Sequence, residues 1–185
     1  MRLLLPGILA MAIIVVASNI LVQYPLGAFL TWGAFTYPFA FLVNEIVNRF
    51  EGSAAARKVV LAGFLTGIAC SFIGTQIQGE FGPLVTFRIA LGSGTAFLAA
   101  QLLDITIFNR FRRGLWWKAP LIGSQVASVV DTGVFFFLAF AGTSLNWLQL
   151  AGGDLLVKAA MAVLLLAPYR ALLPHLQTWS PATSR

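Results

Sequence analysis

Five ionisable side chains interrupt the apolar stretches of this sequence: Glu45, Arg88, Asp104, Asp131 and Lys158. If those stretches lie in a bilayer, each charge costs about 2.5–3.5 kcal/mol at the membrane centre, and five unpaired charges cost on the order of 10 kcal/mol. That sum rivals the roughly 5–15 kcal/mol that keeps a typical protein folded. The five side chains must therefore pair with one another, face the interior of a helix bundle or line a water-filled path.

The composition of the chain places these stretches in a membrane. Hydrophobic residues make up 59% of the 185 residues and charged residues 10%, and the mean hydropathy is +0.87, whereas soluble domains carry about 25% charged residues. The net charge of +6 comes mostly from basic residues in short loops, so we expect a lipid bilayer and no nucleic acid as partner. The single cysteine, Cys70, excludes an intrachain disulfide and a cysteine metal cluster.

Apolar runs of about 20 residues recur along the chain, which predicts an all-α integral membrane protein with one domain over residues 1–185. The spans must be helices because lipid offers no partners for backbone groups. The first run also resembles a signal peptide, with Arg2 before it and Val15, Val16 and Ala17 near its end, but we expect it to remain as a span. The expected bundle has six transmembrane helices: 3–23, 28–48, 58–77, 84–108, 119–141 and 153–173.

Loop charges predict the orientation of this bundle. Ten lysines and arginines lie at the termini and in the second and fourth loops, whereas the alternate loops, 24–27, 78–83 and 142–152, contain none. Cytoplasmic loops carry the excess of basic residues, so we expect both termini in the cytoplasm.

The polar residues within the spans fall into two layers when their depth is estimated from the helical rise. Asp131 lies 13 residues beyond Lys118, which places it about 20 Å from the cytoplasmic edge at about 1.5 Å per residue. The outer layer consists of Asn19, Gln23, Arg88, Asp131 and Lys158. The inner layer contains Glu45 and Asp104, toward the cytoplasmic ends of their spans.

Helical spacing groups further polar residues with these charges. Ser124, Ser128, Asp131 and Thr132 share one face of the fifth span, and Gln101 stands three residues before Asp104. One interpretation is that such stripes join helices, with Asp131 paired to Arg88 or Lys158. For the set as a whole we favour a polar cavity, because joining helices rarely requires three acids and two bases.

Signs of an enzyme are sparse. His175 is the only histidine and lies near the C-terminus, so we expect no catalytic triad and no metal site in the membrane. Glu45, Asp104 and Asp131 could form an acidic dyad, but no glycine or phosphate motif accompanies them. The small residues around Gly92 and Gly94 suit close helix packing, within the fold first and across a homodimer second.

Several segments resemble one known family, the queuosine precursor transporters, also called vitamin uptake transporters. The resemblance covers five of the six spans and extends to Lys158 and the Pro168-Tyr169 end of the sixth. It lies in SNILVQYP (18–25), TWGAFTYPFAFLVNEIVNRFEG (31–52), RIALGSGTAFLAAQLLDITIFNR (88–110), WWKAP (116–120) and SVVDTGVFFFLAF (128–140).

The resemblance implies a multi-pass importer of the bacterial inner membrane, without a cofactor, that takes up 7-deazaguanine precursors of the tRNA base queuosine. Its substrates would be bases of the 7-cyano-7-deazaguanine or 7-aminomethyl-7-deazaguanine type. Glu45 stands where family members carry aspartate, which keeps the charge. By position, the polar motif residues of the family correspond to Asn19, Gln23, Glu45, Arg88, Gln101, Asp104, Asp131 and Lys158.

A flat base of this kind needs aromatic walls and a few convergent polar groups. Trp32 and Tyr37 are candidate walls, and we expect Asp131, with Ser128 and Gln125 nearby, to read the guanine-like edge. Two other classes fit the same residues. A substrate-binding membrane subunit of an energy-coupling vitamin importer would have a similar size and span count, and a purely structural membrane protein is the third class.

Overall fold

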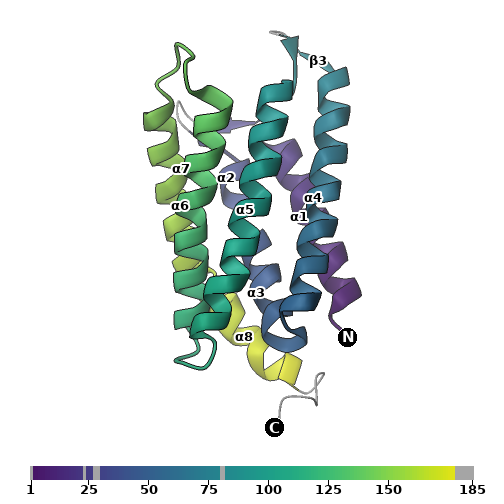
Figure 1. The fold of residues 1–185 in the computed structure, drawn as a ribbon, viewed down its shortest axis with the longest axis vertical. Helices are drawn as coiled ribbons and strands as arrows, with labels where there is room; N and C mark the ends of the chain where they lie inside the picture. The colour runs from purple at the N-terminus through teal and green to yellow at the C-terminus, as the bar shows by residue number, and fades with distance from the viewer. Residues whose placement is uncertain (1, 23, 27–29, 80–81, 178–185) are drawn as a thin grey trace.

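The computed structural model describes residues 2–22, 24–26, 30–79 and 82–177, which form an upright bundle of helices (Figure 1). Two short antiparallel strand pairs lie between helices: β1 (Pro25–Leu26) with β2 (Leu30–Thr31), and β3 (Gln78–Gly79) with β4 (Gly82–Pro83). The helices in these ranges are α1 (Leu4–Leu21), α2 (Gly33–Thr36), α3 (Phe39–Glu51), α4 (Ser53–Gln76), α5 (Phe87–Phe111), α6 (Lys118–Phe140), α7 (Trp147–Leu164) and α8 (Leu166–Gln177).

Five helical segments are long and apolar enough to cross a membrane: α1, α4, α5, α6 and the stretch Trp147–Leu176, which joins α7 to most of α8. The predicted class, a helical membrane protein, is therefore confirmed. The expected span 28–48 differs, because the described part of it contains two helices, α2 and α3, and not one. Alone, the 13 residues of α3 extend only about 20 Å, less than the hydrocarbon thickness of about 30 Å.

Both helix interruptions occur beside prolines. At Pro38, the amides of Ala40 and Phe41 bond to carbonyls three residues back, those of Tyr37 and Pro38, so the chain tightens locally into a 3₁₀ turn. Between α7 and α8, Pro168 has no amide to donate to the carbonyl four residues back, and its ring crowds that carbonyl. In Figure 1, α8 turns away from the direction of α7 and passes beneath the bundle.

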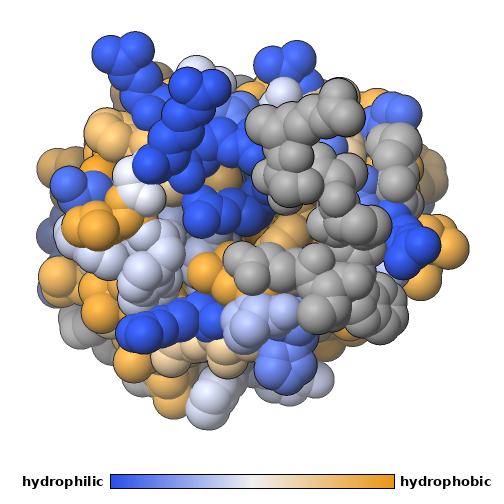
Figure 2. Space-filling view, turned by 90° about the horizontal axis from the view of Figure 1, so that it is seen from below, coloured by the Kyte–Doolittle hydropathy of each residue, from blue (hydrophilic) through white to orange (hydrophobic). Residues whose placement is uncertain are grey.

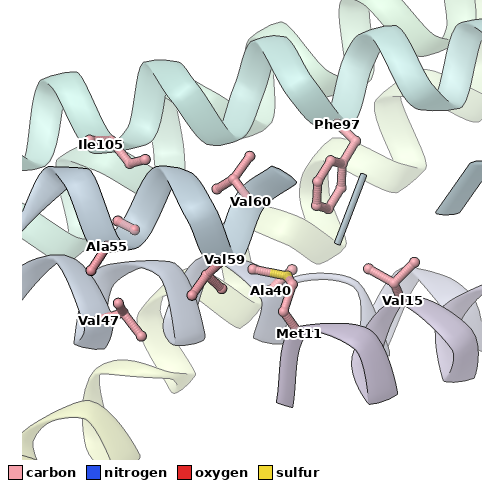
Figure 3. Packing of buried hydrophobic residues seen from close by; sticks show 10 residues of the cluster. Met11, Val15, Ala40, Val47, Ala55, Val59, Val60, Phe97 and Ile105 are labelled. Carbon is pink, nitrogen blue, oxygen red and sulfur yellow. The ribbon is translucent and has the colours of Figure 1, made fainter. Parts of the chain in front are cut away.

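The apolar core lies where α1, α3, α4 and α5 meet. Met11 and Val15 of α1 pack with Val59 of α4 and Phe97 of α5 (Figure 3). Gly63 of α4 permits this approach, because a methyl group at Gly63 would lie 2.6 Å from Met11 and 2.9 Å from Phe97. On the other side of α5, α6 packs along most of its length. In this scaffold α3 contacts α5 on one hand and α8 on the other.

The start of α1 and the end of α8 lie at one end of the bundle, together with the α3–α4 and α5–α6 connections (Figure 1). Viewed from that end, hydrophilic side chains gather over the face and hydrophobic side chains lie around its edge (Figure 2). Two arginines bind each other's backbone there: Arg49 Nη1 donates to the Arg112 carbonyl at 3.1 Å, and Arg112 Nη2 donates to the Arg49 carbonyl at 3.0 Å. These bonds connect the ends of α3 and α5.

Candidate functional site

A buried lysine organises the first of two polar groups in the bundle. Lys158 Nζ donates to Asp131 Oδ2 at 2.6 Å, to Thr132 Oγ1 at 3.1 Å and to Asp154 Oδ2. Only 5% of the Lys158 side chain is exposed. An ammonium group has three donors, so every donor of Lys158 is used. We call Tyr37, Asp131, Thr132, Asp154 and Lys158 the Lys158 cluster.

The remaining contacts of the Lys158 cluster complete a network. Tyr37 donates its hydroxyl to Asp131 Oδ1 at 3.0 Å, and Thr132 donates to Asp154 Oδ2 at 2.7 Å. The lysine ammonium also lies 5.3 Å from the centroid of the Tyr37 ring, within the range of a cation–π contact. With both acids ionised, the two carboxylates outnumber the single ammonium by one negative charge.

Three elements supply the Lys158 cluster. α6 contributes Asp131 and Thr132, α7 contributes Asp154 and Lys158, and Tyr37 lies at the junction of α2 and α3. Asp154 was not among the predicted residues, although its distance of four positions from Lys158 is the spacing at which helical side chains meet. Tyr37 was expected only as an aromatic wall. Its hydroxyl is the group that connects the α2–α3 junction to α6.

A small cavity lies beside the cluster, between α3, α6 and α7. It has room for about one water molecule. Pro38 and Leu165, the residues at the two helix interruptions, both line this cavity. Its polar lining comes from Glu45, Ser124, Ser128 and Lys158, and the rest from Phe41, Leu42, Pro120, Ala162 and Leu166.

The second polar group lies on α3 and α5, and we call it the acidic layer: Asn44, Glu45, Asn48, Gln101 and Asp104. All five side chains are at most 4% exposed. Asn44 Nδ2 donates to Asp104 Oδ2 at 3.0 Å and to the Gln101 carbonyl at 3.1 Å. Glu45 also lines the cavity, so the acidic layer and the Lys158 cluster border the same small space.

The acidic layer contains buried polar atoms that lack a hydrogen-bond partner within the described ranges. Most buried polar groups in proteins are paired, so a concentration of exceptions on two facing helices is unusual. The atoms are Asn44 Oδ1, Glu45 Oε1, Asn48 Oδ1, Gln101 Nε2, Gln101 Oε1 and Asp104 Oδ1, with the nearby hydroxyl of Tyr169.

A glycine on α6 allows the acidic layer to pack against that helix. A methyl group on Gly123 would lie 2.5 Å from Asp104 Oδ1, which is too close for any side chain. A larger residue at position 123 would therefore push the Asp104 carboxylate away from α6.

The structure brings some of the predicted residues together at the cavity. Of the two partners expected for Asp131, Lys158 is the one it contacts. Ser128 lines the cavity, and Gln125 Nε2 donates to the Ala159 carbonyl at 3.0 Å, joining α6 to α7. Glu45 and Asp104, which were expected together in the inner layer, both lie in the acidic layer, and Gln101 lies with them.

Other predicted residues lie elsewhere. Arg88 is exposed and donates from Nε to the Leu138 carbonyl at 2.6 Å and from Nη2 to the Ala141 carbonyl. It binds the C-terminal end of α6, where carbonyl groups lack helical partners, and not Asp131. Asn19 donates to the Val15 carbonyl of its own helix at 2.8 Å, and Trp32 is 49% exposed. Gln23 lies outside the described residues.

A polar network buried among apolar helices is typical of membrane transport proteins. The sequence profile of the family described as "Putative vitamin uptake transporter" matches residues 31–172. The chain belongs to this vitamin uptake transporter family. The predicted resemblance is therefore confirmed, and the family together with the apolar helices identifies a multi-pass protein of the bacterial inner membrane that carries a small molecule.

Named relatives of this transporter come from three bacteria. The queuosine precursor transporter of Escherichia coli is 34% identical, over 84% of this chain and 79% of the relative. A probable queuosine precursor transporter of Haemophilus influenzae is 32% identical over the same shares, and one of Bacillus subtilis is 30% identical over 75% and 69%. No solved structure matches the chain significantly.

Proposed function

We propose that this transporter imports 7-deazaguanine precursors of queuosine through the cavity between α3, α6 and α7. The observation that carries the proposal is the Lys158 cluster, a buried set of donors and acceptors beside a small cavity in a chain whose relatives are named for this substrate. The substrates are bases of the 7-cyano and 7-aminomethyl type, taken up for modification of tRNA.

The Lys158–Asp131 pair has the chemistry that the guanine-like edge requires. That edge presents a carbonyl oxygen next to a ring N–H and an exocyclic amino group. The Lys158 ammonium is a donor suited to the carbonyl, and the Asp131 carboxylate is a pure acceptor suited to the two N–H groups. Each Asp131 oxygen has one protein partner, Tyr37 or Lys158, and keeps a second lone pair for an N–H group of the base. The three Lys158 donors are all used, so the carbonyl of the base has to take the place of one of their acceptors.

Substrate binding also requires the bundle to open. The cavity has room for about one water molecule, far less than a bicyclic base. Pro38 and Leu165, beside the two helix interruptions, both line this cavity, and interrupted helices are a common element of transporter binding sites. We infer that α2 and α7 separate there to admit the base, with Ser128 and Gln125 available to it on α6.

The proposed topology has six membrane-crossing segments with both termini in the cytoplasm. α2 and α3 together cover Gly33–Glu51 and serve as the second segment, interrupted at Pro38. The basic residues support the orientation, since they lie in the helix ends on both sides of the α3–α4 junction and around the α5–α6 connection. A homodimer is not required, because the proposed path lies within one chain and the small-residue stripe near Gly92 packs against α6.

Uptake by the purified transporter in liposomes tests the proposal. We expect labelled 7-cyano-7-deazaguanine to enter without any partner protein. Asp131→Asn should reduce uptake roughly tenfold or more. The amide introduced at position 131 would direct a donor at the N–H groups of the base, which weakens binding by about 1–3 kcal/mol. Glu51→Gln, a carboxylate change at the end of α3, is the matched control and should keep uptake.

An analogue without the exocyclic amino group gives the decisive comparison. It should compete poorly with the parent base for the unmodified transporter. If it competes equally well, Asp131 does not read this edge. If the purified chain binds the base tightly but moves none, a substrate-binding subunit of an energy-coupling importer is the better assignment.

A further inference from the structure

Recognition of the base by Asp131 and Lys158 does not use the acidic layer, of which only Glu45 lines the cavity. Two carboxylates, Glu45 and Asp104, are buried there at 4% and 0% exposure. No lysine or arginine among the described residues forms an ion pair with either. A buried carboxylate without a cation is costly when ionised, and two neighbouring ones repel each other as well.

The charged and titratable groups around this pair do not neutralise it. Tyr169 of α8 lies within electrostatic range of both acids and of Arg49 and Arg112. The two arginines direct their donors at each other's backbone carbonyls. Lys158 lies across the cavity and uses its three donors on Asp131, Thr132 and Asp154.

We propose that Glu45 and Asp104 form a proton-binding site that couples import of the base to the proton gradient. This inference rests on the proposed function and adds its source of energy. In each cycle one proton from the outside binds a carboxylate of the pair and converts it to a carboxylic acid. The same proton returns to water on the cytoplasmic side, and the carboxylate is restored.

The positions of the two acids assign them different parts in this exchange. Glu45 lines the cavity, which has room for about one water molecule, so it is the acid that can exchange a proton with water there. Asp104 lies between the Asn44 amide and Gly123, out of the cavity. The unpartnered oxygens of Glu45 and Asp104 are the atoms on which a proton can be held.

A sodium ion bound to both oxygens of Asp104 would have to displace the Asn44 N–H group, whereas a proton on Asp104 Oδ1 would not. Sodium requires a shell of oxygen ligands, whereas this layer also places amide N–H groups among its oxygens. Asn44 Nδ2 donates directly to Asp104, and Gln101 Nε2 is a buried donor without a partner within the described ranges. Such N–H groups stabilise a negative oxygen while a proton is absent and would repel a metal cation.

Transport assays on the full chain in liposomes test this coupling. Two quantities are measured for labelled 7-cyano-7-deazaguanine: exchange between equal concentrations on the two sides, and accumulation driven by an inwardly directed pH gradient. One proton per neutral base allows at most about tenfold accumulation per pH unit. We expect both Glu45→Gln and Asp104→Asn to reduce accumulation to onefold, and Asp104→Asn, whose side chain lies out of the cavity, to keep exchange. Glu51→Gln is the control and should accumulate like the unmodified chain.

The outcomes separate this inference from the function on which it rests. If the unmodified chain neither exchanges nor accumulates the base, the proposed function fails and the coupling with it. If it exchanges the base but accumulates it only under a sodium gradient, or if Glu45→Gln still accumulates it under the pH gradient, import stands and proton coupling is refuted.

A folding defect is distinguished by a second variant. Glu45→Asp keeps the carboxylate and should restore accumulation at least in part. Each variant is checked for a single symmetrical peak in size-exclusion chromatography. A correctly folded Glu45→Gln protein that loses exchange as well as accumulation would place Glu45 in base binding and overturn its role as a proton site.

Discussion

Replacing Lys158 by methionine removes the only cation of the Lys158 cluster while keeping most of its volume. The cluster then changes from one excess negative charge to two, because Asp131 and Asp154 remain. Removing one partner of a buried ion pair costs about 3–5 kcal/mol, since the other charge stays buried and unpaired. For a chain of this size, that cost lowers the melting temperature by on the order of 10 °C.

Adding Asp131→Asn to Lys158→Met returns the excess to one negative charge. We therefore expect the double variant to recover at least half of the lost stability, although each single change is destabilising. Melting is followed in detergent by the fraction of monodisperse protein that remains after heating. Lys118→Met, which removes a lysine beside the Trp117 ring at the start of α6, is the control and should melt near the unmodified protein. Additive losses in the double variant would refute the charge-balance reasoning.

Three further predictions concern the scaffold and its topology. Arg88→Gln removes two hydrogen bonds to the C-terminal carbonyls of α6. In a thermal melt we expect the free energy of unfolding to fall by about 1 kcal/mol, with unchanged affinity for the base. Weaker binding would place Arg88 in the substrate site. Gly123→Ala forces a methyl group against Asp104 and should cost about 1–3 kcal/mol, whereas Gly133→Ala, with open space around it, should gain about 0.5–1 kcal/mol. A phosphatase reporter fused after residue 185 should be inactive, because it needs the periplasm; activity there would reverse the proposed orientation.

The class of the fold could be predicted from the sequence because it depends on local properties, whereas the partner of Asp131 was narrowed only to Arg88 or Lys158. Length and apolarity of the runs predict membrane helices without tertiary information. Asp131 and Lys158 had to find partners because unpaired charges in a membrane are costly, and the structure pairs them with each other. The inner acids Glu45 and Asp104 likewise lie at one level.

Other features depend on contacts that the sequence does not display. The run 28–48 has the hydropathy of one span, and averaging over it hides the missing amide of Pro38. Arg88 binds carbonyls about 50 residues further along the chain, and any exposed helix end could have served it equally well. The spacing of Asp154 from Lys158 indicates a contact between them. Because Asp154 lies at the margin of the expected span, hydropathy does not mark it as a charge in the membrane.

The reciprocal bonds between Arg49 and Arg112 limit how this transporter can open at that end of the bundle. Each arginine closes on the other's backbone, so the lower ends of α3 and α5 are fastened by two bonds that would have to break together. We therefore expect the two helices that carry the acidic layer to move together. The cavity is then expected to open along its other lining, at Leu165 between α7 and α8, with the distance between Glu45 and Asp104 kept.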